Sequence, residues 1–386
     1  MCMAANRYMI HATPELADQE LEAIAAIKQL QSDLQLRTAE PRRWHGQIRR
    51  QVQAANIRGS TMIEGYNVSV EDSEAIVDRR PTAESVDHDA VRAYQRAMTY
   101  VLQAARDSHF EYSAGVLKVV HFIVTEFDLD AHPGRLREGP VFVADSKTGT
   151  VRYTGADVDL VPFLITELCD HLNTPRLSEP MVEAAMAHLN LINIHPFKDG
   201  NGRMSRILQT LVLARGGILV PEFASIEEYL GDYTQGYYDI LSQVGTKQWA
   251  PEQDALPWVR YCLNAHHIQA HNVRRRIRRA EALWEMLEEA VTNAGVALRS
   301  VGGIHDATLD KLVTNSSYRT AVKSSEADEI SNKTASTDLA GLVAGGLLDS
   351  RGSGRSAHYV ATTKLMALVA SVNNEFAATP TPNLFS

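Results

Sequence analysis

Strand-forming sequence is scarce in this chain, and that scarcity constrains the fold more than any other feature. Before residue 300 the best strand candidate is GPVFVADSKTGTVRYTG (139–155), where two short β-prone runs flank a turn at Ser146–Gly149. This is the pattern of a β-hairpin. Most of the remaining sequence up to residue 291 carries apolar residues at helical spacing. We therefore predict a mainly α-helical bundle with one β-hairpin.

The expected helices follow from this spacing and from the breakers between them. Helical patterns cover 17–58, interrupted by Pro41, then 91–105, 113–127, 158–172, 180–193 and 203–214, the last closed by Gly216 and Gly217. A polar stretch from Asn67 to Asp89 separates the first pattern from the second. One or two long helices begin after Pro257, and we take 251–294 as a helical linker.

The C-terminal part has a different composition. Gly, Ser and Thr become frequent near Gly295, where we place a domain boundary. Residues 308–348 suggest three short helices, and SRGSGRSAHYVA (350–361) suggests a Gly-rich turn between two strands. This layout predicts a small winged-helix domain at 295–373. The tail at 374–386 is expected to be disordered.

Composition narrows the class of protein. The 386 residues are 45% apolar and 22% charged, which is typical of a folded globular protein with two or three units. The net charge of -9 argues against a protein that coats nucleic acid or anionic membrane. Cys2, Cys169 and Cys262 are too few and too far apart to indicate disulfides or zinc. Because LVLARGGILV is interrupted by Arg215, no membrane span is expected, and we expect a cytoplasmic protein.

The segment HPFKDGNGRMSR, from His195 to Arg206, gathers residue types that suit the phosphates of a nucleotide. Its glycines let backbone N–H groups approach an anion, and the helix expected from Arg203 aims its positive end at the same place. Arg203 and Arg206 are three positions apart, so they can contact successive phosphate oxygens from one helix face. Asp199 offers an oxygen ligand for Mg²⁺, and His195 offers a base for an attacking hydroxyl.

The same segment satisfies every specified position of HxFx(D/E)GNGRxxR, the signature of the Fic family, which this sequence resembles. Upstream PGRLREGPVFV and downstream SIEEYLGDYTQGYYDIL are also similar to family sequences. The resemblance implies an α-helical catalytic core at 107–250. It also implies an enzyme that transfers AMP from ATP to a Ser, Thr or Tyr hydroxyl of a protein, and to itself, with Mg²⁺.

The resemblance also implies a role for each residue of the segment. His195 would deprotonate the target hydroxyl, Asp199 would hold Mg²⁺, Asn201 with the backbone amides of Gly200 and Gly202 would hold the α- and β-phosphates, Arg203 would bind the β-phosphate, and Arg206 would bind the γ-phosphate. Phe197 is expected to be a core anchor that fixes the loop.

The hairpin and a group of tyrosines complete the implied site. The hairpin from Val141 to Tyr153 resembles the family's flap, which would hold an extended target segment by strand addition. Tyr229, Tyr233, Tyr237 and Tyr238 could flank the adenine, because aromatic faces stack on bases. Since several of the four must be core residues, we take Tyr233 and Tyr238 as the adenine contacts.

A second motif, SxxxEG, lies in ANIRGSTMIEGYN at Ser60, Glu64 and Gly65. Alone it describes only a helix end. The family, however, carries an inhibitory helix of the form (S/T)xxxE(G/N), which implies that the region 1–106 contains such a helix. Glu64 would pair with Arg206 and deny the γ-phosphate its partner, and Ser60, one turn earlier, would hold the Glu64 carboxylate in place.

Other functions remain open at this point. On the same scaffold they are a kinase, UMP or phosphocholine transfer, and removal of AMP. Doc-type kinases carry Lys where this chain has Gly202, which weakens the kinase reading.

A DNA-binding regulator with a Fic effector domain is an alternative of another class, supported by Lys333, Arg351 and Arg355. Residues 301–386 hold seven Lys or Arg against eight Asp or Glu, so DNA binding is not indicated. Protein binding or formation of a homodimer explains a winged helix equally well.

Overall fold

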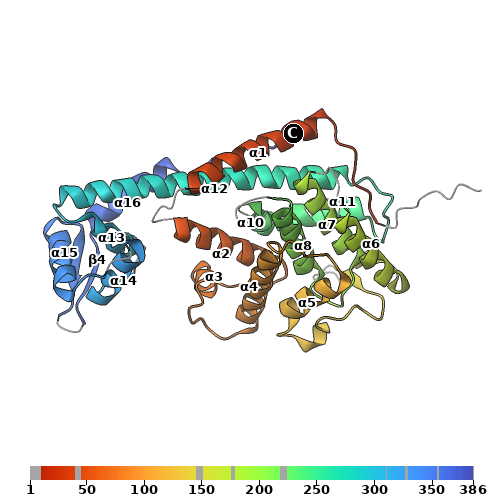
Figure 1. Cartoon of the computed structure of the whole chain (residues 1–386), viewed down its shortest axis with the longest axis horizontal. Helices are drawn as coiled ribbons and strands as arrows, with labels where there is room; N and C mark the ends of the chain where they lie inside the picture. Colours follow the sequence, from red (N-terminus) through yellow and green to blue (C-terminus); the bar gives the residue numbers. More distant parts are fainter. Residues whose placement is uncertain are drawn as a thin grey trace, which may run out of the picture. The chain divides into compact units, whose positions relative to one another are not determined.

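Helices dominate the computed structural model of the chain, which confirms the predicted mainly α-helical class (Figure 1). The structure describes residues 10–39, 45–144, 151–174, 179–217, 224–309, 311–326, 329–353 and 356–385. The predicted break at Pro41, the predicted Ser146–Gly149 turn and Arg355 lie outside these residues.

The chain divides into two compact units. The first comprises Met1–Ala39, Arg49–His271 and Thr381–Ser386, and the second comprises Glu40–Ile48 and Asn272–Pro380. The division falls inside the continuous helix α12 (Leu256–Asn293) and not near Gly295, where the sequence predicted it. The reason is local, because residues 258–291 contain no Gly or Pro that would end a helix.

The helices of the first unit are α1 (Asp18–Ala39), α2 (His45–Ile63, in this unit from Arg49), α3 (Val70–Val77), α4 (Val86–Ala104), α5 (Ala114–Thr125), α6 (Val161–Asn173), α7 (Pro180–Ile194), α8 (Asn201–Arg215), α10 (Glu227–Asp232), α11 (Thr234–Gly245) and the first part of α12. Short 3₁₀ turns lie at Leu129–Ala131 and Val158–Leu160.

One short helix stands where the sequence predicted a polar connection. Helix α3 begins after Ser69, whose Oγ accepts a hydrogen bond from the N–H of Asp72, and buries Ala75 and Ile76. An N-cap and two buried apolar side chains are enough to stabilise two turns of helix against a core, although they leave no long periodic pattern in the sequence.

Helices α7 and α8 form the centre of the first unit. Nearly every residue of both is buried, as expected for helices that are surrounded by protein on all sides. They pack against each other, and α4, α5 and α6 pack around them (Figure 1). The loop between α7 and α8, residues 195–200, is therefore held at both ends by buried helices.

The predicted hairpin is present. Strand β1 (Phe142–Ala144) pairs antiparallel with β2 (Val151–Thr154), with Phe142 opposite Thr154 and a register shift between Val143 and Ala144. Phe142 and Val151 remain exposed on the hairpin.

The second unit contains the end of α12, a 3₁₀ turn at Leu298–Ser300, α13 (Val301–Thr308), α14 (Asn315–Glu326), α15 (Asn332–Ala344), β3 (Leu348–Arg351), β4 (His358–Ala361) and α16 (Thr363–Glu375). Three helices followed by an antiparallel hairpin is the predicted order, but the first helix ends at Thr308, where the predicted range of the three helices begins. Helix α16 was not predicted. Thr362 caps it, and Leu365 is buried on it. The winged-helix assignment stays a prediction.

The C-terminal residues differ from the disordered tail that the sequence predicted. The N–H of Leu384 donates to Oδ1 of Asn264 at 3.1 Å, and Leu384 and Phe385 pack against the core of the first unit. The guanidinium of Arg260 lies 5.7 Å from the centre of the Phe385 ring. Leu384 and Phe385 lie at the end of a polar, Pro-rich stretch and cover part of the first unit's core. Composition alone did not predict this contact.

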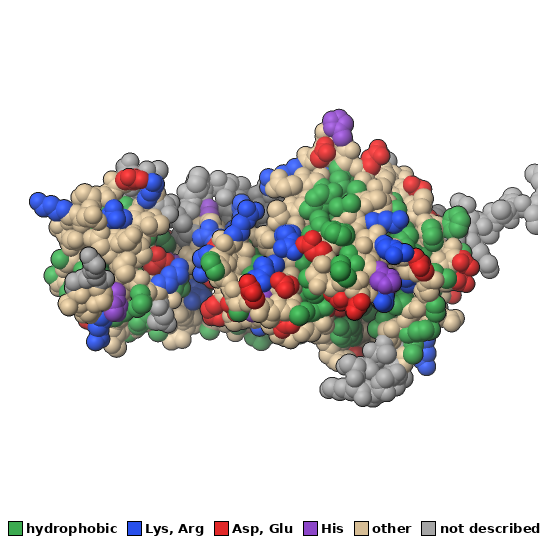
Figure 2. All heavy atoms as spheres, turned by 90° about the horizontal axis from the view of Figure 1, so that it is seen from below, with side chains coloured by type: hydrophobic (Ala, Val, Ile, Leu, Met, Phe, Trp, Pro, Cys, Tyr) green, Lys and Arg blue, Asp and Glu red, His purple; other side chains and the backbone are tan. Residues whose placement is uncertain are grey.

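On the face in Figure 2, acidic and basic side chains are interspersed. In the described ranges no helix combines the length and the apolar character that a membrane crossing requires.

Candidate active site

The loop between α7 and α8 has two residues with left-handed backbone. His195 ends α7 with φ 52° and ψ 60°, and its N–H donates to the carbonyl of Leu191 at 3.0 Å. Gly200 precedes α8 with φ 77°. A left-handed conformation is uncommon for residues other than Gly, Asn and Asp, so surrounding contacts must hold His195 in place. Gly200 adopts this backbone without strain.

Asn201 holds the loop together. The N–H of Phe197 donates to its Oδ1, and its Nδ2 donates to the carbonyl of Phe197, both at 2.9 Å. The side-chain amide of Asn201 is therefore used in hydrogen bonds within the loop. The backbone N–H groups at the start of α8 remain available to bind an anion. Phe197 is fully buried, as a core anchor should be.

His121 on α5 supports the same loop, although no sequence pattern singled it out. Its ring stacks on Phe197 with 3.8 Å between ring centres. Because the N–H of Gly134 donates to Nδ1 at 2.9 Å, the ring proton is on Nε2, which donates to the carbonyl of Asp199 at 3.0 Å. Burial lowers the pKa of His121 to about 4, so the imidazole stays neutral.

The imidazole of His195 is arranged as a base. Nδ1 lies 3.0 Å from the carbonyl of Ile192, so Nδ1 carries the proton and Nε2 carries the lone pair. The pKa of His195 is lowered to about 4, mainly by burial and also by the charge of Arg137, against the opposing effects of Ile192, Glu64 and Asp199. At neutral pH the ring can therefore accept a proton.

Arg203 and Arg206 point from α8 into the protein, and each is 1% exposed. The Arg203 guanidinium lies 5.1 Å from the centre of the Tyr66 ring and 5.7 Å from that of Phe127. Its NH2 is 3.2 Å from Oδ2 of Asp199. The predicted phosphate ligand and the predicted Mg²⁺ ligand are thus neighbours, and Asp199 keeps 52% of its side chain exposed.

Arg206 is bound by α2. Its NH2 donates to Oε1 of Glu64 at 2.7 Å and to the carbonyl of Ser60 at 3.0 Å, and its Nε donates to Oγ of Ser60 at 2.6 Å. The ion pair between Glu64 and Arg206 is the one that the resemblance implied. Ser60 differs from the prediction, because its hydroxyl binds the arginine and not the carboxylate.

Glu64 lies where an anion would lie. An added Cβ at Gly202 would collide with Oε1 of Glu64 and would be 3.2 Å from NH1 of Arg206. That buried NH1 has no hydrogen-bond partner within the described part of the chain. Burial alone would raise the pKa of Glu64, but the charges of Arg206 and Arg203 hold it below its usual range. A carboxylate therefore occupies the positive N-terminus of α8.

Helix α2 is seated against α10 by two glycines. A Cβ on Gly59 would be 2.6 Å from the carbonyl oxygen of Glu227, and a Cβ on Gly231 would be 2.6 Å from Cα of Gly59. The hydroxyl of Tyr238 also donates to the carbonyl of Ile63 at 3.1 Å. This backbone-to-backbone contact sets how deeply α2 enters the site, five residues before Glu64.

The four tyrosines separate into two pairs. Tyr229 and Tyr237 are buried, and the hydroxyl of Tyr237 is 2.9 Å from Nε2 of His188. Tyr233 is 55% exposed and Tyr238 is 43% exposed. The exposed pair, Tyr233 and Tyr238, are the two residues that the sequence analysis selected, and their contact with adenine stays a prediction.

A metal would depend on the nucleotide for most of its ligands. Over the ranges that the structure covers, no three His, Cys, Asp or Glu side chains gather into a metal site. Asp199 is a single accessible carboxylate beside the start of α8. This fits Mg²⁺, which binds one or two carboxylates together with phosphate oxygens and water, and does not fit a closed protein cage.

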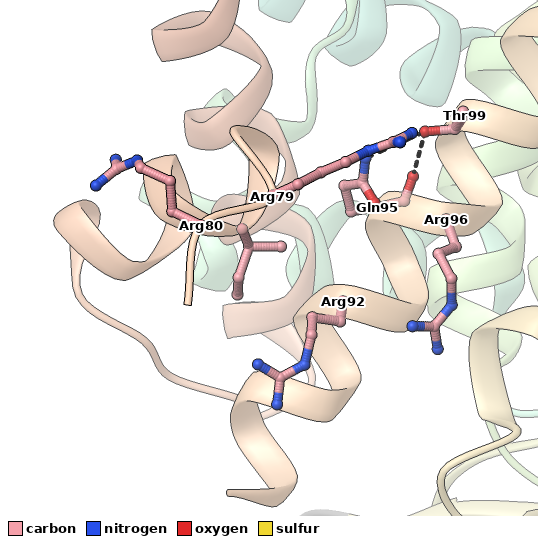
Figure 3. A pocket seen from close by; sticks show the side chains of 7 residues that line it. Arg79, Arg80, Arg92, Gln95, Arg96 and Thr99 are labelled. Carbon is pink, nitrogen blue, oxygen red and sulfur yellow. Dashed lines mark hydrogen bonds between the residues drawn. The ribbon is translucent and has the colours of Figure 1, made fainter. Parts of the chain in front are cut away.

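A separate pocket of about 420 Å³ lies at the end of α3 and along α4, lined by Ile76, Arg79, Arg80, Arg92, Gln95, Arg96 and Thr99. Arg92 already pairs with Asp89, and Arg96 pairs with Glu126. In Figure 3 the guanidinium groups of Arg80, Arg92 and Arg96 extend in separate directions and do not converge. The loop at the start of α8 is therefore the stronger candidate for binding phosphates.

Known proteins resemble this chain in sequence. The profile of the Fic/DOC family matches residues 111–213. The chain is 27% identical over 260 residues to "Protein adenylyltransferase Fic" of Aedes aegypti, covering 64% of this chain and 44% of that protein. It is 26% identical over 179 residues to "Protein adenylyltransferase fic-1" of Caenorhabditis elegans, covering 45% and 33%. The chain thus spans less than half the length of these relatives.

Solved structures share the fold. A Fic family protein from Desulfovibrio desulfuricans superposes with a TM-score of 0.59 at 20% identity, covering 92% of this chain and 98% of that one. Fic-1 from Caenorhabditis elegans superposes with a TM-score of 0.53 at 19% identity, covering 68% and 73%. With the signature loop lying between two buried helices, these comparisons agree that the chain carries a Fic/DOC family domain over residues 111–213.

Proposed function

We propose that this chain is a protein adenylyltransferase that transfers AMP from ATP to a Ser, Thr or Tyr hydroxyl of a target protein and of itself. The observation that carries the proposal is the neutral imidazole of His195, with its Nε2 lone pair available beside an N-terminal helix end that holds two buried arginines. The names of the curated relatives support the same activity.

The proposed reaction is an in-line displacement at the α-phosphorus of ATP. Nε2 of His195 takes the proton of the target hydroxyl while that oxygen forms a bond to the α-phosphorus. The bond to the bridging oxygen breaks, and pyrophosphate leaves. The backbone N–H groups of Gly202 and its neighbours hold phosphate oxygens, Arg203 binds the β-phosphate and Arg206 binds the γ-phosphate.

The other parts of the site take supporting roles in this proposal. Asp199 would hold Mg²⁺, and the ion would supply positive charge beside the phosphates. The exposed rings of Tyr233 and Tyr238 stack on the adenine. The hairpin β1–β2 takes up an extended target segment as an added strand.

Buried, unpaired Cys169 and Cys262 suit a reducing cytoplasmic location.

The chain is proposed to be autoinhibited by Glu64. The γ-phosphate and the Glu64 carboxylate compete for Arg206, and they would repel each other if both were present. With Glu64 in the position described above, ATP binds poorly or in an unproductive pose.

For the second unit we propose recruitment of a protein, or formation of a homodimer, through a winged-helix domain at 295–373. Its nearly balanced charge supports this over sequence-specific binding of DNA.

Labelled ATP distinguishes the proposed chemistry from the alternatives on this scaffold. Incubation in lysate with ATP labelled at the α-phosphate is expected to label protein, with release of pyrophosphate. ATP labelled at the γ-phosphate is expected to add no label beyond that of the same lysate without this chain. Protein labelled only by γ-phosphate would identify a kinase and overturn the proposal.

The seat of α2 on α10 gives a test of inhibition that touches no charged group. Gly59→Ala is expected to raise the initial rate of self-modification roughly 3- to 10-fold, because the new methyl meets backbone of α10 and must push α2 outward. Gly231→Ala should act in the same way. The measurement is incorporation of α-labelled AMP at equal ATP and Mg²⁺.

Gly115→Ala is the control for adding a methyl to a helix of the same unit, because the nearest atom to its Cβ is 3.6 Å away. It should leave the rate unchanged. Equal rates for the parent and Gly59→Ala would show that α2 does not need this seat to place Glu64.

A further inference from the structure

Arg137 is a buried arginine, and each of its three side-chain nitrogens donates to a backbone carbonyl. It is 8% exposed, and no carboxylate of the described residues forms an ion pair with it. Its Nε donates to the carbonyl of His195 at 2.8 Å, its NH1 to that of Gly139 at 2.8 Å, and its NH2 to that of Ala156. Burial lowers the pKa of Arg137, with Asp157 acting in the opposite sense. Burying a charge without a carboxylate partner costs free energy, which these hydrogen bonds must offset.

The three carbonyls belong to two parts of the proposed site. His195 carries the base, whereas Gly139 precedes β1 and Ala156 follows β2. In addition, the N–H of Arg137 donates to the carbonyl of Pro196 at 3.0 Å. One side chain therefore joins the loop of the base to both ends of the hairpin.

Further contacts press the hairpin onto the same loop. The hydroxyl of Tyr153 on β2 donates to the carbonyl of Asn193 at the end of α7. At Gly155 an added Cβ would be 3.0 Å from Cβ of His195 and 3.2 Å from NH2 of Arg137. At Gly155 there is no room for a side chain, so the end of the hairpin packs directly against His195.

We propose that Arg137 is a positioning residue that fixes His195 relative to the hairpin, so that a hydroxyl presented by a target strand meets Nε2 of the base. This inference rests on the proposed function, because it requires a target segment at the hairpin. The planar guanidinium can reach three carbonyls in fixed directions, which a lysine ammonium on a flexible stem cannot do. Arg137 also keeps the uncommon left-handed backbone of His195 in place.

The same arrangement has an electrostatic consequence. The groups that act on the His195 imidazole are Arg137, Glu64, Asp199 and the carbonyl of Ile192, in addition to burial. Arg137 is the one charge among them that lowers the pKa of His195. Loss of that charge therefore raises this pKa, and the acid limb of the pH–rate profile moves to higher pH, because the base must be neutral to act.

The test compares Arg137→Gln, Arg137→Lys and the control Arg135→Gln, all in a Glu64→Gly background. Arg135 is exposed and pairs with Glu138. Arg137→Gln should lower kcat for self-modification about 100-fold, since a misplacement of about 1 Å has that effect. The KM for ATP should stay within about threefold, because no nucleotide contact is changed. Its acid limb should move to higher pH.

Arg137→Lys separates charge from geometry. It should restore most of the pH profile but little of kcat, and Arg135→Gln should match the parent in both. If Arg137→Gln keeps the parental kcat, or loses kcat with an unchanged acid limb and a lowered Tm, Arg137 is an ordinary stabilising residue and the inference is wrong. If Arg137→Gln does not fold, Gly155→Ala takes its place and should lower kcat at unchanged KM for ATP.

An NMR titration of the His195 ring keeps this result separate from that of the proposed function. If Glu64→Gly enzyme transfers no α-label, the proposed function fails. The His195 pKa should still be higher in Arg137→Gln than in Arg135→Gln, and an equal pKa in the two variants would overturn the inference.

Discussion

His195→Ala is expected to lower the rate of AMP transfer by about 10²- to 10⁴-fold, the usual contribution of a positioned general base. The neutral ring of His195, with a lone pair on Nε2, can take the proton of a target hydroxyl that is bound near the start of α8. The base contacts the substrate mainly in the transition state, so the affinity for ATP should change little. The measurement is single-turnover transfer of α-labelled AMP beside equilibrium binding of ATP, both in the Glu64→Gly background.

His132→Ala is the matched control. His132 also has left-handed backbone, with φ 54°, but it is exposed and lies outside the site. Its replacement should leave transfer unchanged, which separates loss of the base from relief of backbone strain. If His195→Ala transfers AMP as fast as the parent, another group must be the base.

Glu64→Gly is expected to raise the initial rate of self-modification roughly 10- to 100-fold, which corresponds to one charge-assisted hydrogen bond regained by the γ-phosphate. Removal of the carboxylate frees Arg206 and empties the space over Gly202. The rate is measured with α-labelled ATP at equal ATP and Mg²⁺ for the parent and each variant.

Companion variants make the result specific. Glu64→Gln should activate less than Glu64→Gly, because it removes the charge but still fills the space, and exposed Glu71→Gln should have no effect. Arg206→Ala should not mimic activation, since it deletes the partner of the phosphate as well. Ser60→Ala should activate weakly, because the hydroxyl binds Arg206 and not Glu64. Equal rates for Glu64→Gly and the parent would show that SxxxEG is only the end of a helix and that Glu64 does not inhibit transfer.

The parts of the site that could be predicted are those whose residues are adjacent in the sequence. In the segment from His195 to Arg206, spacing along a loop and one helix turn already determines which groups can meet. The pairing of Glu64 with Arg206 spans more than a hundred residues, and it could be expected only from the family resemblance. The hairpin was visible because alternating β-prone runs were rare in the chain.

The supporting contacts could not be predicted in the same way. Arg137 and His121 act through hydrogen bonds to distant backbone carbonyls, which leave no periodic pattern. Gly59 and Gly231 owe their role to a close approach of two helices that neither local sequence encodes. Asn201 was expected at the phosphates, whereas its amide holds Phe197, because a buried amide bonds to the nearest unpaired backbone groups.

The fully buried guanidinium of Arg206 depends on an anion for its stability. When α2 is docked, Glu64 is that anion. Once α2 withdraws, the charge is left without a partner unless a polyphosphate enters, and a ligand present at 100 times its Kd then contributes about 2.7 kcal/mol to folding. In the proposed autoinhibition, Glu64 at the end of α2 would therefore take the place of the ATP phosphate at Arg206. At low ATP concentration the chain would then stay folded and inactive. A variant that cannot dock α2 would lose stability as the ATP concentration falls.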